Sequence, residues 1–246
     1  MVAEIVLFIV LLFLLVIGLT LFPEAANSLA SLMLKLQYAA TEQAAIRLLL
    51  PHLLKPAVIL PMLGVVSVLI PLIEEPLKTI GVWFFWKQPL SPAEGFALGI
   101  LSGAGYALFE SLGMGSNTDS GWGTLMLARF GTDLVHILNG GLMGWALVRA
   151  WREKRFLQLG MTYVLAVLIH GLWNTASIFF SISHLISILP DPPTSLQNLG
   201  MISALGLIVL ICLMLAVLWL VNRKLRAASR PTQPLPVPPA TMQTDV

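Results

Sequence analysis

The stretch PLIEEPLKTIGVWFFW, residues 71–86, carries two adjacent glutamates and a lysine inside a long apolar run. That run begins near residue 56 and exceeds the roughly 20 residues that a helix needs to cross a bilayer. Over the whole chain, 57% of the 246 residues are hydrophobic and 11% are charged, against about 25% charged residues in a soluble domain. The composition therefore predicts an integral membrane protein.

Net charge and cysteine content argue against nucleic-acid binding, disulfides and cysteine-based metal sites. The net charge of +2 is small, so we expect no nucleic-acid partner. The single cysteine, Cys212, lies in an apolar run and has no second cysteine to pair with. Neither a disulfide nor a cysteine-based metal site is therefore expected.

Hydropathy predicts an all-α, polytopic transmembrane helical bundle with about six spans. The expected spans are residues 2–22, 56–86, 94–114, 122–149, 157–182 and 198–221. Residues 27–50 mix Lys35, Glu42 and Arg47 with apolar residues at helical spacing, which favours an interfacial helix. An additional span there is the alternative. We expect an N-terminal anchor and amphipathic helix over 1–55, a transmembrane catalytic bundle over 56–221, and a disordered proline-rich cytoplasmic tail over 222–246.

Basic residues predict the orientation in the membrane. The segments RAWREKR (149–155) and NRKLRAASR (222–230) are strongly basic, whereas the loops around Asp119 and Asp191 contain no Lys or Arg. Short cytoplasmic loops carry an excess of Lys and Arg, so both basic segments should be cytoplasmic. With an even number of spans, both termini are then expected on the cytoplasmic side.

Several spans contain ionisable or strongly polar residues, which are costly in a bilayer and usually face the protein interior. They are Glu74, Glu75, Lys78, Glu110, Arg129, Asp133, His136, His170 and Asn174. Structural roles are the alternative for each. The Glu74, Glu75 and Lys78 spacing allows an ion pair on one helix face. Asp133 and His136, at i and i+3, are candidates for a polar pair between helices.

The height of these residues favours a shared site. Counting about 1.5 Å per helical residue from the expected cytoplasmic ends gives four side chains a common height of roughly 20–26 Å: Glu74, Glu110, His136 and His170. This layer falls in the outer half of a hydrocarbon core about 30 Å thick. Unrelated structural residues would not be expected to agree in height.

Carboxylates and imidazoles can activate water, protonate a leaving amine or ligate a metal. The sequence contains no H-E-x-x-H, G-x-S-x-G or phosphate-binding glycine motif, so hydrolysis by activated water fits best. Pro71 and Pro76 flank the two glutamates and should kink the span. The kink would turn the carboxylates toward a shared cavity.

Four motifs, taken in order over about residues 65–180, resemble the PrsW family of intramembrane proteases. They are P-x-x-E-E-P-x-K (71–78), F-E (109–110), the R…H…G-x-x-G run from Arg129 through His136 to Gly144, and H-G-L-W-N (170–174). That family is similar in turn to the CAAX prenyl protease (Abi) superfamily. Met114 departs from the pattern, because the family often has an aromatic residue four positions after the F-E glutamate.

The resemblance implies a protease of a bacterial cell membrane that cleaves a membrane-anchored protein substrate within the lipid bilayer. It assigns the site to Glu74, Glu75, Glu110, His136, His170 and Asn174. We expect Glu74 to be the general base, Glu75 to orient the site or bind a metal, and Lys78 to tune the pair. The resemblance implies a metal, for which Zn²⁺ on His136, His170 and Glu110 is the candidate, and a metal-free glutamate protease is the alternative. Asn174 is expected to donate to the oxyanion.

Two other classes of protein also fit buried carboxylates and histidines. A proton- or ion-coupled transporter needs such groups at mid-depth, although residues 56–221 show no obvious inverted repeat. A non-catalytic membrane scaffold or immunity-type protein would keep the fold without the chemistry. Proteolysis of a membrane substrate, ion flux, or neither activity would distinguish the three.

Overall fold

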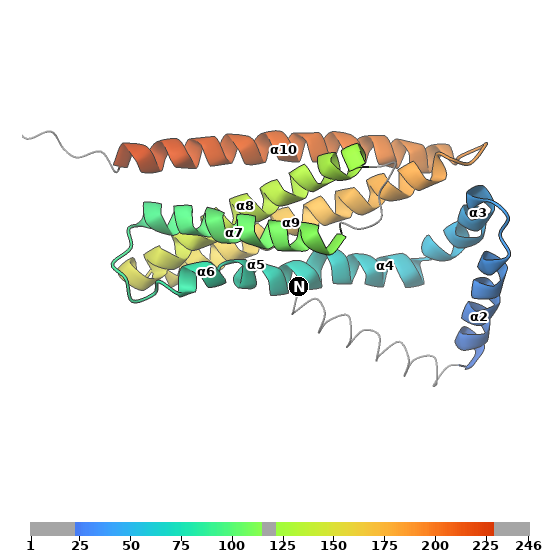
Figure 1. Cartoon of the computed structure of the whole chain (residues 1–246), viewed down its shortest axis with the longest axis horizontal. Helices are drawn as coiled ribbons and strands as arrows, with labels where there is room; N and C mark the ends of the chain where they lie inside the picture. Colours follow the sequence, from blue (N-terminus) through green and yellow to red (C-terminus); the bar gives the residue numbers. More distant parts are fainter. Residues whose placement is uncertain (1–22, 115–121, 229–246) are drawn as a thin grey trace, which may run out of the picture.

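The computed structural model describes residues 23–114 and 122–228, where every regular element is a helix. The helices are α2 (Pro23–Gln37), α3 (Glu42–Leu53), α4 (Pro56–Gly64), the π-helix η1 (Val65–Leu69), α5 (Ile70–Lys78), α6 (Ile80–Trp83), α7 (Pro92–Met114), α8 (Trp122–Glu153), α9 (Phe156–Ile186) and α10 (Thr194–Ala228). Helices α7 to α10 run along one long axis, with α2 and α3 at one end (Figure 1). The all-α prediction is confirmed for the described residues.

Four helical segments in the described part of the chain are long and apolar enough to cross a membrane: Pro56–Trp83, Pro92–Leu112, Phe156–Ile186 and Thr194–Ala227. The expected first span, 2–22, lies outside the described residues. Helix α8 has the length of a span, but Asp133, His136 and Asn139 lower its hydropathy. The prediction of about six spans is therefore not confirmed.

Residues 27–50 do not form the single interfacial helix that the sequence pattern predicts. They divide into α2 and α3, of 15 and 12 residues, and each is shorter than the roughly 20 residues of a membrane span. Thr41 causes the break, because its side chain caps α3 by accepting a hydrogen bond from the Ala44 N–H. A serine or threonine at this position favours a new helix start.

The span that contains the glutamates departs from regular α-helix on both sides of them, at the π-helix η1 and at Thr79. Upstream of Pro71 the chain forms the π-helix η1, in which the Ile70 N–H donates to the Val65 carbonyl. This pattern frees the Val66 carbonyl, which accepts a 2.8 Å hydrogen bond from Asn174 Nδ2 on α9. Proline has no N–H to continue a helix, so carbonyls in this span take partners from a neighbouring helix.

Close contact between α7 and α8 depends on glycine. A Cβ added at Gly99 would lie 2.1 Å from the Gly140 carbonyl oxygen, and one added at Gly103 would lie 2.2 Å from the His136 carbonyl oxygen. The small-x-x-x-small spacing therefore serves helix packing, as expected. It also fixes the height of His136 relative to α7.

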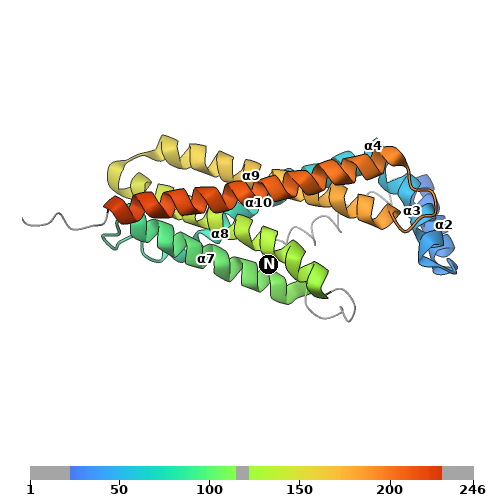
Figure 2. The same ribbon diagram turned by 90° about the horizontal axis from the view of Figure 1, so that it is seen from above.

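Helix α8 lies at the centre of the bundle. Its apolar side chains Leu134, Val135 and Leu138 form a buried cluster with Trp173 of α9 and Met214 of α10. Figure 2 shows α9 and α10 running beside each other along this core. The α8–α9 connection and the C-terminal end of α10, both basic, lie at the same end of the bundle (Figures 1 and 2). Helix α10 continues to Ala228, so the expected tail cannot start at residue 222.

Candidate active site

Glu75 is the most completely enclosed acidic residue of the site. Its Oε1 accepts a 2.7 Å hydrogen bond from Lys78 Nζ and lies 2.7 Å from His170 Nδ1. The Glu75 and Lys78 side chains are both 0% exposed. Helix α5 supplies the glutamate and the lysine at i and i+3, and α9 supplies the histidine. Such a carboxylate is held in position by two partners and is poorly placed to move.

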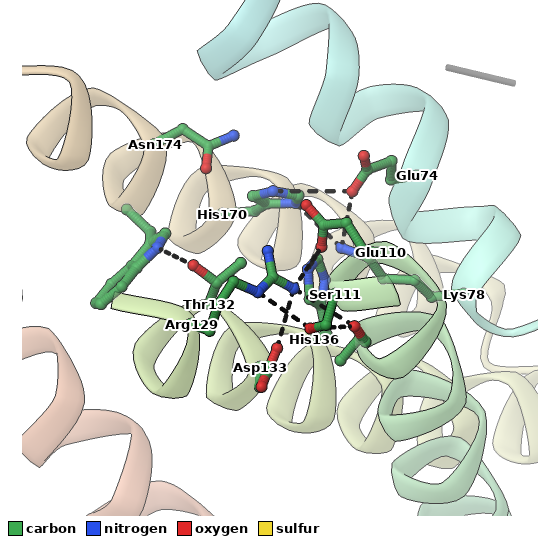
Figure 3. Close-up of polar contacts among 12 residues, drawn as sticks. Glu74, Lys78, Glu110, Ser111, Arg129, Thr132, Asp133, His136, His170 and Asn174 are labelled. Atoms are coloured by element: carbon green, nitrogen blue, oxygen red, sulfur yellow. Dashed lines mark hydrogen bonds and ion pairs between the residues drawn. The ribbon is translucent and has the colours of Figure 1, made fainter. Parts of the chain in front are cut away.

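Glu74 is buried beside the same lysine and histidine. Its Oε2 lies 3.3 Å from Lys78 Nζ and 3.8 Å from His170 Nε2, and Figure 3 shows the carboxylate facing His170. Lys78 therefore does form the ion pair that the spacing allowed. However, it serves two carboxylates with one positive charge, and the shorter contact goes to Glu75.

A second polar cluster joins α7 to α8. Glu110 Oε2 lies 2.8 Å from His136 Nε2 and 3.1 Å from Arg129 Nη2. The same Arg129 nitrogen lies 3.1 Å from Asp133 Oδ1. Asp133 thus contacts Arg129 while His136 contacts Glu110, so each of the two residues suggested as a polar pair has its own charged partner. The arginine side chain is long enough to reach both Asp133, one turn further along α8, and Glu110 on α7.

The two clusters meet through their aromatic rings. The His136 and His170 rings are perpendicular, with centroids 5.5 Å apart. Tyr106 lies 5.3 Å from the His136 ring, and Lys78 Nζ lies 5.3 Å from the centre of the Tyr106 ring. Side chains from α5, α7, α8 and α9 therefore form one continuous polar site inside an otherwise apolar bundle (Figure 3).

Asn174 lies one turn after His170 on α9 (Figure 3). One of its amide hydrogens is used in the bond to the Val66 carbonyl. A primary amide has two hydrogens to donate, so this contact leaves one for another acceptor. Asn174 therefore ties α9 to η1 beside the five glutamates and histidines that the structure brings together.

The side chains of this site are of types that bind metals, but their positions do not form a metal-binding group. Glutamate oxygens and histidine nitrogens are ordinary zinc ligands, and His136 Nδ1 is buried without a hydrogen-bond partner among the described residues. Yet in that part of the chain no three His, Cys, Asp or Glu side chains form a group able to hold a metal ion. Lys78 Nζ lies among Glu74, Glu75 and His170, where it supplies the positive charge.

Three residues of this site were not among the expected site residues. Arg129 was noticed as a polar residue in a span, but its partner Glu110 is nineteen positions away in sequence. Tyr106 lies between the clusters, and Tyr163 donates to the Leu72 carbonyl. From the sequence alone, a single tyrosine in an apolar helix with such a role cannot be distinguished from one that only packs against its neighbours.

The apolar helices and the buried glutamates and histidines between them are those of a polytopic membrane protein with a polar site inside its bundle. A family model described as PrsW family intramembrane metalloprotease matches residues 9–220. The chain therefore belongs to the PrsW family of intramembrane metalloproteases. The match supports an intramembrane endopeptidase that acts on a protein substrate in a membrane, and the family description suggests a metal. No curated protein and no solved structure matched the chain.

Proposed function

We propose that this protein hydrolyses a peptide bond of a membrane-anchored protein with a water molecule activated by Glu74. The supporting observation is the difference between the two adjacent carboxylates. Glu75 is held by two contacts of 2.7 Å, whereas Glu74 Oε2 lies 3.3 Å from Lys78 Nζ and 3.8 Å from His170 Nε2. A general base must accept and release a proton, which favours the carboxylate with the longer distances to this lysine and this histidine.

In this mechanism Glu74 takes a proton from water as the water oxygen attacks the carbonyl carbon of the scissile bond. The carbon–nitrogen bond then breaks, and the proton passes from Glu74 to the leaving amine. Glu75 and Lys78 orient His170 and keep the base near the substrate. His136, held by Glu110, and the second amide hydrogen of Asn174 stabilise the negative oxygen of the tetrahedral intermediate.

The identity of the metal stays a prediction. Zn²⁺ on His136, His170 and Glu110 would polarise the substrate carbonyl, but these side chains would first have to leave their present partners. For that reason the steps above use only groups of the chain itself. The relation to the CAAX prenyl protease superfamily also stays a prediction.

The cytoplasmic position of both termini and a bacterial cell membrane are also part of the proposal. The basic α8–α9 connection and the basic end of α10 lie at one end of the bundle, which supports a common cytoplasmic side. The family match favours the protease over a transporter or a scaffold.

The substitution Glu74→Gln tests the proposal in liposomes that contain a membrane-anchored reporter protein. It keeps the size of the side chain but removes the base, so the cleavage rate should fall about 10²–10⁴-fold. Lys78 keeps Glu75 as its partner, so thermal stability should not fall. The matched control is Glu153→Gln, at the exposed end of α8. A folded Glu74→Gln protein that cleaves at the wild-type rate would exclude Glu74 as the base.

A further inference from the structure

A cavity of about 250 Å³ lies between α5–α6 and α7. Two residues of the polar site, Lys78 and Glu110, form part of its wall. The other side chains of the site are nearly closed to the outside, at 4% exposed or less for Glu74, Glu75, His136 and His170, whereas Glu110 is 21% exposed. This cavity is therefore a direct approach to the site from outside the bundle.

The mouth of the cavity is apolar and faces lipid. It is lined by Leu77, Ile80 and Phe109, which are 38%, 56% and 56% exposed. All three belong to segments able to cross a membrane. A polypeptide that enters here therefore comes sideways from the bilayer. Because lipid tails are as apolar as the cavity, the hydrophobic effect does not favour binding of an apolar side chain, and the cavity must select it by shape.

Gly105 is an exposed position in the wall of the cavity. A Cβ added at Gly105 would have no described atom within 4 Å, whereas Gly99 and Gly103 on the same helix have no room for one. Packing of α7 on α8 explains those two glycines but not Gly105. An engineered apolar cavity of about 150 Å³ holds a benzene ring, so the present volume suits one large apolar side chain.

We propose that this cavity is a substrate subsite, which binds one large apolar side chain beside the scissile bond, and that Gly105 sets the size limit. The proposal rests on the protease function proposed above. Binding there would place the neighbouring peptide bond next to Glu110, the partly exposed member of the polar site that also contains Glu74. The substrate class is then a membrane-anchored protein with leucine, phenylalanine or a similar residue next to the cleaved bond.

The substitution Gly105→Leu tests this subsite, because leucine would fill the cavity and is a good helix former. Gly206→Leu on α10 is the matched control, since a Cβ there also has no described atom within 4 Å. The probes are membrane-anchored reporter peptides in liposomes, identical except for Ala, Val, Leu or Phe at each position around the cleaved bond. Mass spectrometry of the products gives the preference at each position.

Wild-type protein and Gly206→Leu should prefer Leu or Phe at one position by tenfold or more, the scale on which hydrophobic pockets discriminate. Gly105→Leu should reverse that preference, so that the Ala reporter is cleaved faster than the Leu and Phe reporters. An equal loss on all reporters, or an unchanged preference, would overturn the subsite. Absence of cleavage by wild-type protein would instead contradict the proposed function, and the subsite would fall with it.

Discussion

The hydroxyl of Tyr163 donates a 2.8 Å hydrogen bond to the carbonyl of Leu72. In an uninterrupted helix that carbonyl would accept from the residue four positions later, which here is Pro76 and has no N–H. Helix α9, which also carries His170, thus satisfies the group that the proline leaves unpaired. Glu74 and Glu75 lie between Leu72 and Pro76, so this bond fixes the turn that carries both carboxylates.

Tyr163→Phe should weaken this turn. Within a membrane an unpaired carbonyl has no water to bond, so we expect a loss of about 1 kcal/mol in the free energy of unfolding. The cleavage rate should fall as well, because small misplacements of catalytic groups are costly. The control is Tyr38→Phe, because Tyr38 is 77% exposed. Equal thermal stability and turnover in both variants would show that the bond is unimportant.

Arg129→Gln should be one of the most destabilising single changes in α8. It leaves Glu110 and Asp133 without their shared cation, and breaking a buried ion pair costs about 3–5 kcal/mol. We expect the lower end, about 3 kcal/mol, because the Glu110 and Asp133 side chains are 21% and 35% exposed. Denaturation in detergent measures the effect.

The matched control for Arg129 is Arg149→Gln. Arg149 pairs with Glu153 at 2.7 Å on the same helix, but at its exposed end. Surface pairs contribute about 0–1 kcal/mol, so this variant should be nearly as stable as the wild type. Similar losses in the two arginine variants would contradict a special role for Arg129.

Gly99→Ala should push α7 away from α8, because the new Cβ would lie 2.1 Å from the Gly140 carbonyl oxygen. Overpacking of this kind costs about 1–3 kcal/mol. Gly160→Ala meets no described atom within 4 Å and should be neutral or slightly stabilising, since alanine favours helix. The unfolding temperatures of the two alanine variants should therefore shift in opposite directions or by clearly different amounts.

The zinc hypothesis predicts about one equivalent of metal in the purified protein, measured by elemental analysis and reduced by His136→Ala or His170→Ala. Activity that survives a strong chelator, in protein with no detectable metal, would favour the carboxylate mechanism alone. Lys78→Met provides a second measurement. Lys78 Nζ lies 3.2 Å from Nδ1 of His170, one of the expected zinc ligands. If the lysine ammonium competes with a cation for this histidine, the variant should retain more zinc than the wild type.

Topology can be tested with two single-cysteine proteins in which Cys212 is replaced by serine. A cysteine at position 153 lies at the basic end of the bundle, and one at position 191 lies in the connection between α9 and α10. The first should react only with reagent on the cytoplasmic side, and the second only from outside. The reverse labelling would overturn the proposed orientation.

The amino-acid sequence was sufficient to predict long apolar helices, their approximate bounds and the residues worth suspecting. Apolar content over about 20 residues is a local property, and a buried charge is conspicuous in any apolar run. Glu74, Glu75, Glu110, His136 and His170 could therefore be selected without knowing the fold. The proline pair likewise predicted a distorted span.

Which polar groups meet could be known only from the folded chain. Arg129 contacts Glu110 across nineteen residues, and Tyr163 contacts Leu72 across ninety-one. Neighbours in sequence do not settle such contacts, because Asp133 pairs with Arg129 and His136 pairs with Glu110 of another helix. Such contacts depend on the relative height and rotation of packed helices, which glycines such as Gly99 and Gly103 fix through close approach. A helix of given sequence can face any direction until its neighbours are in place.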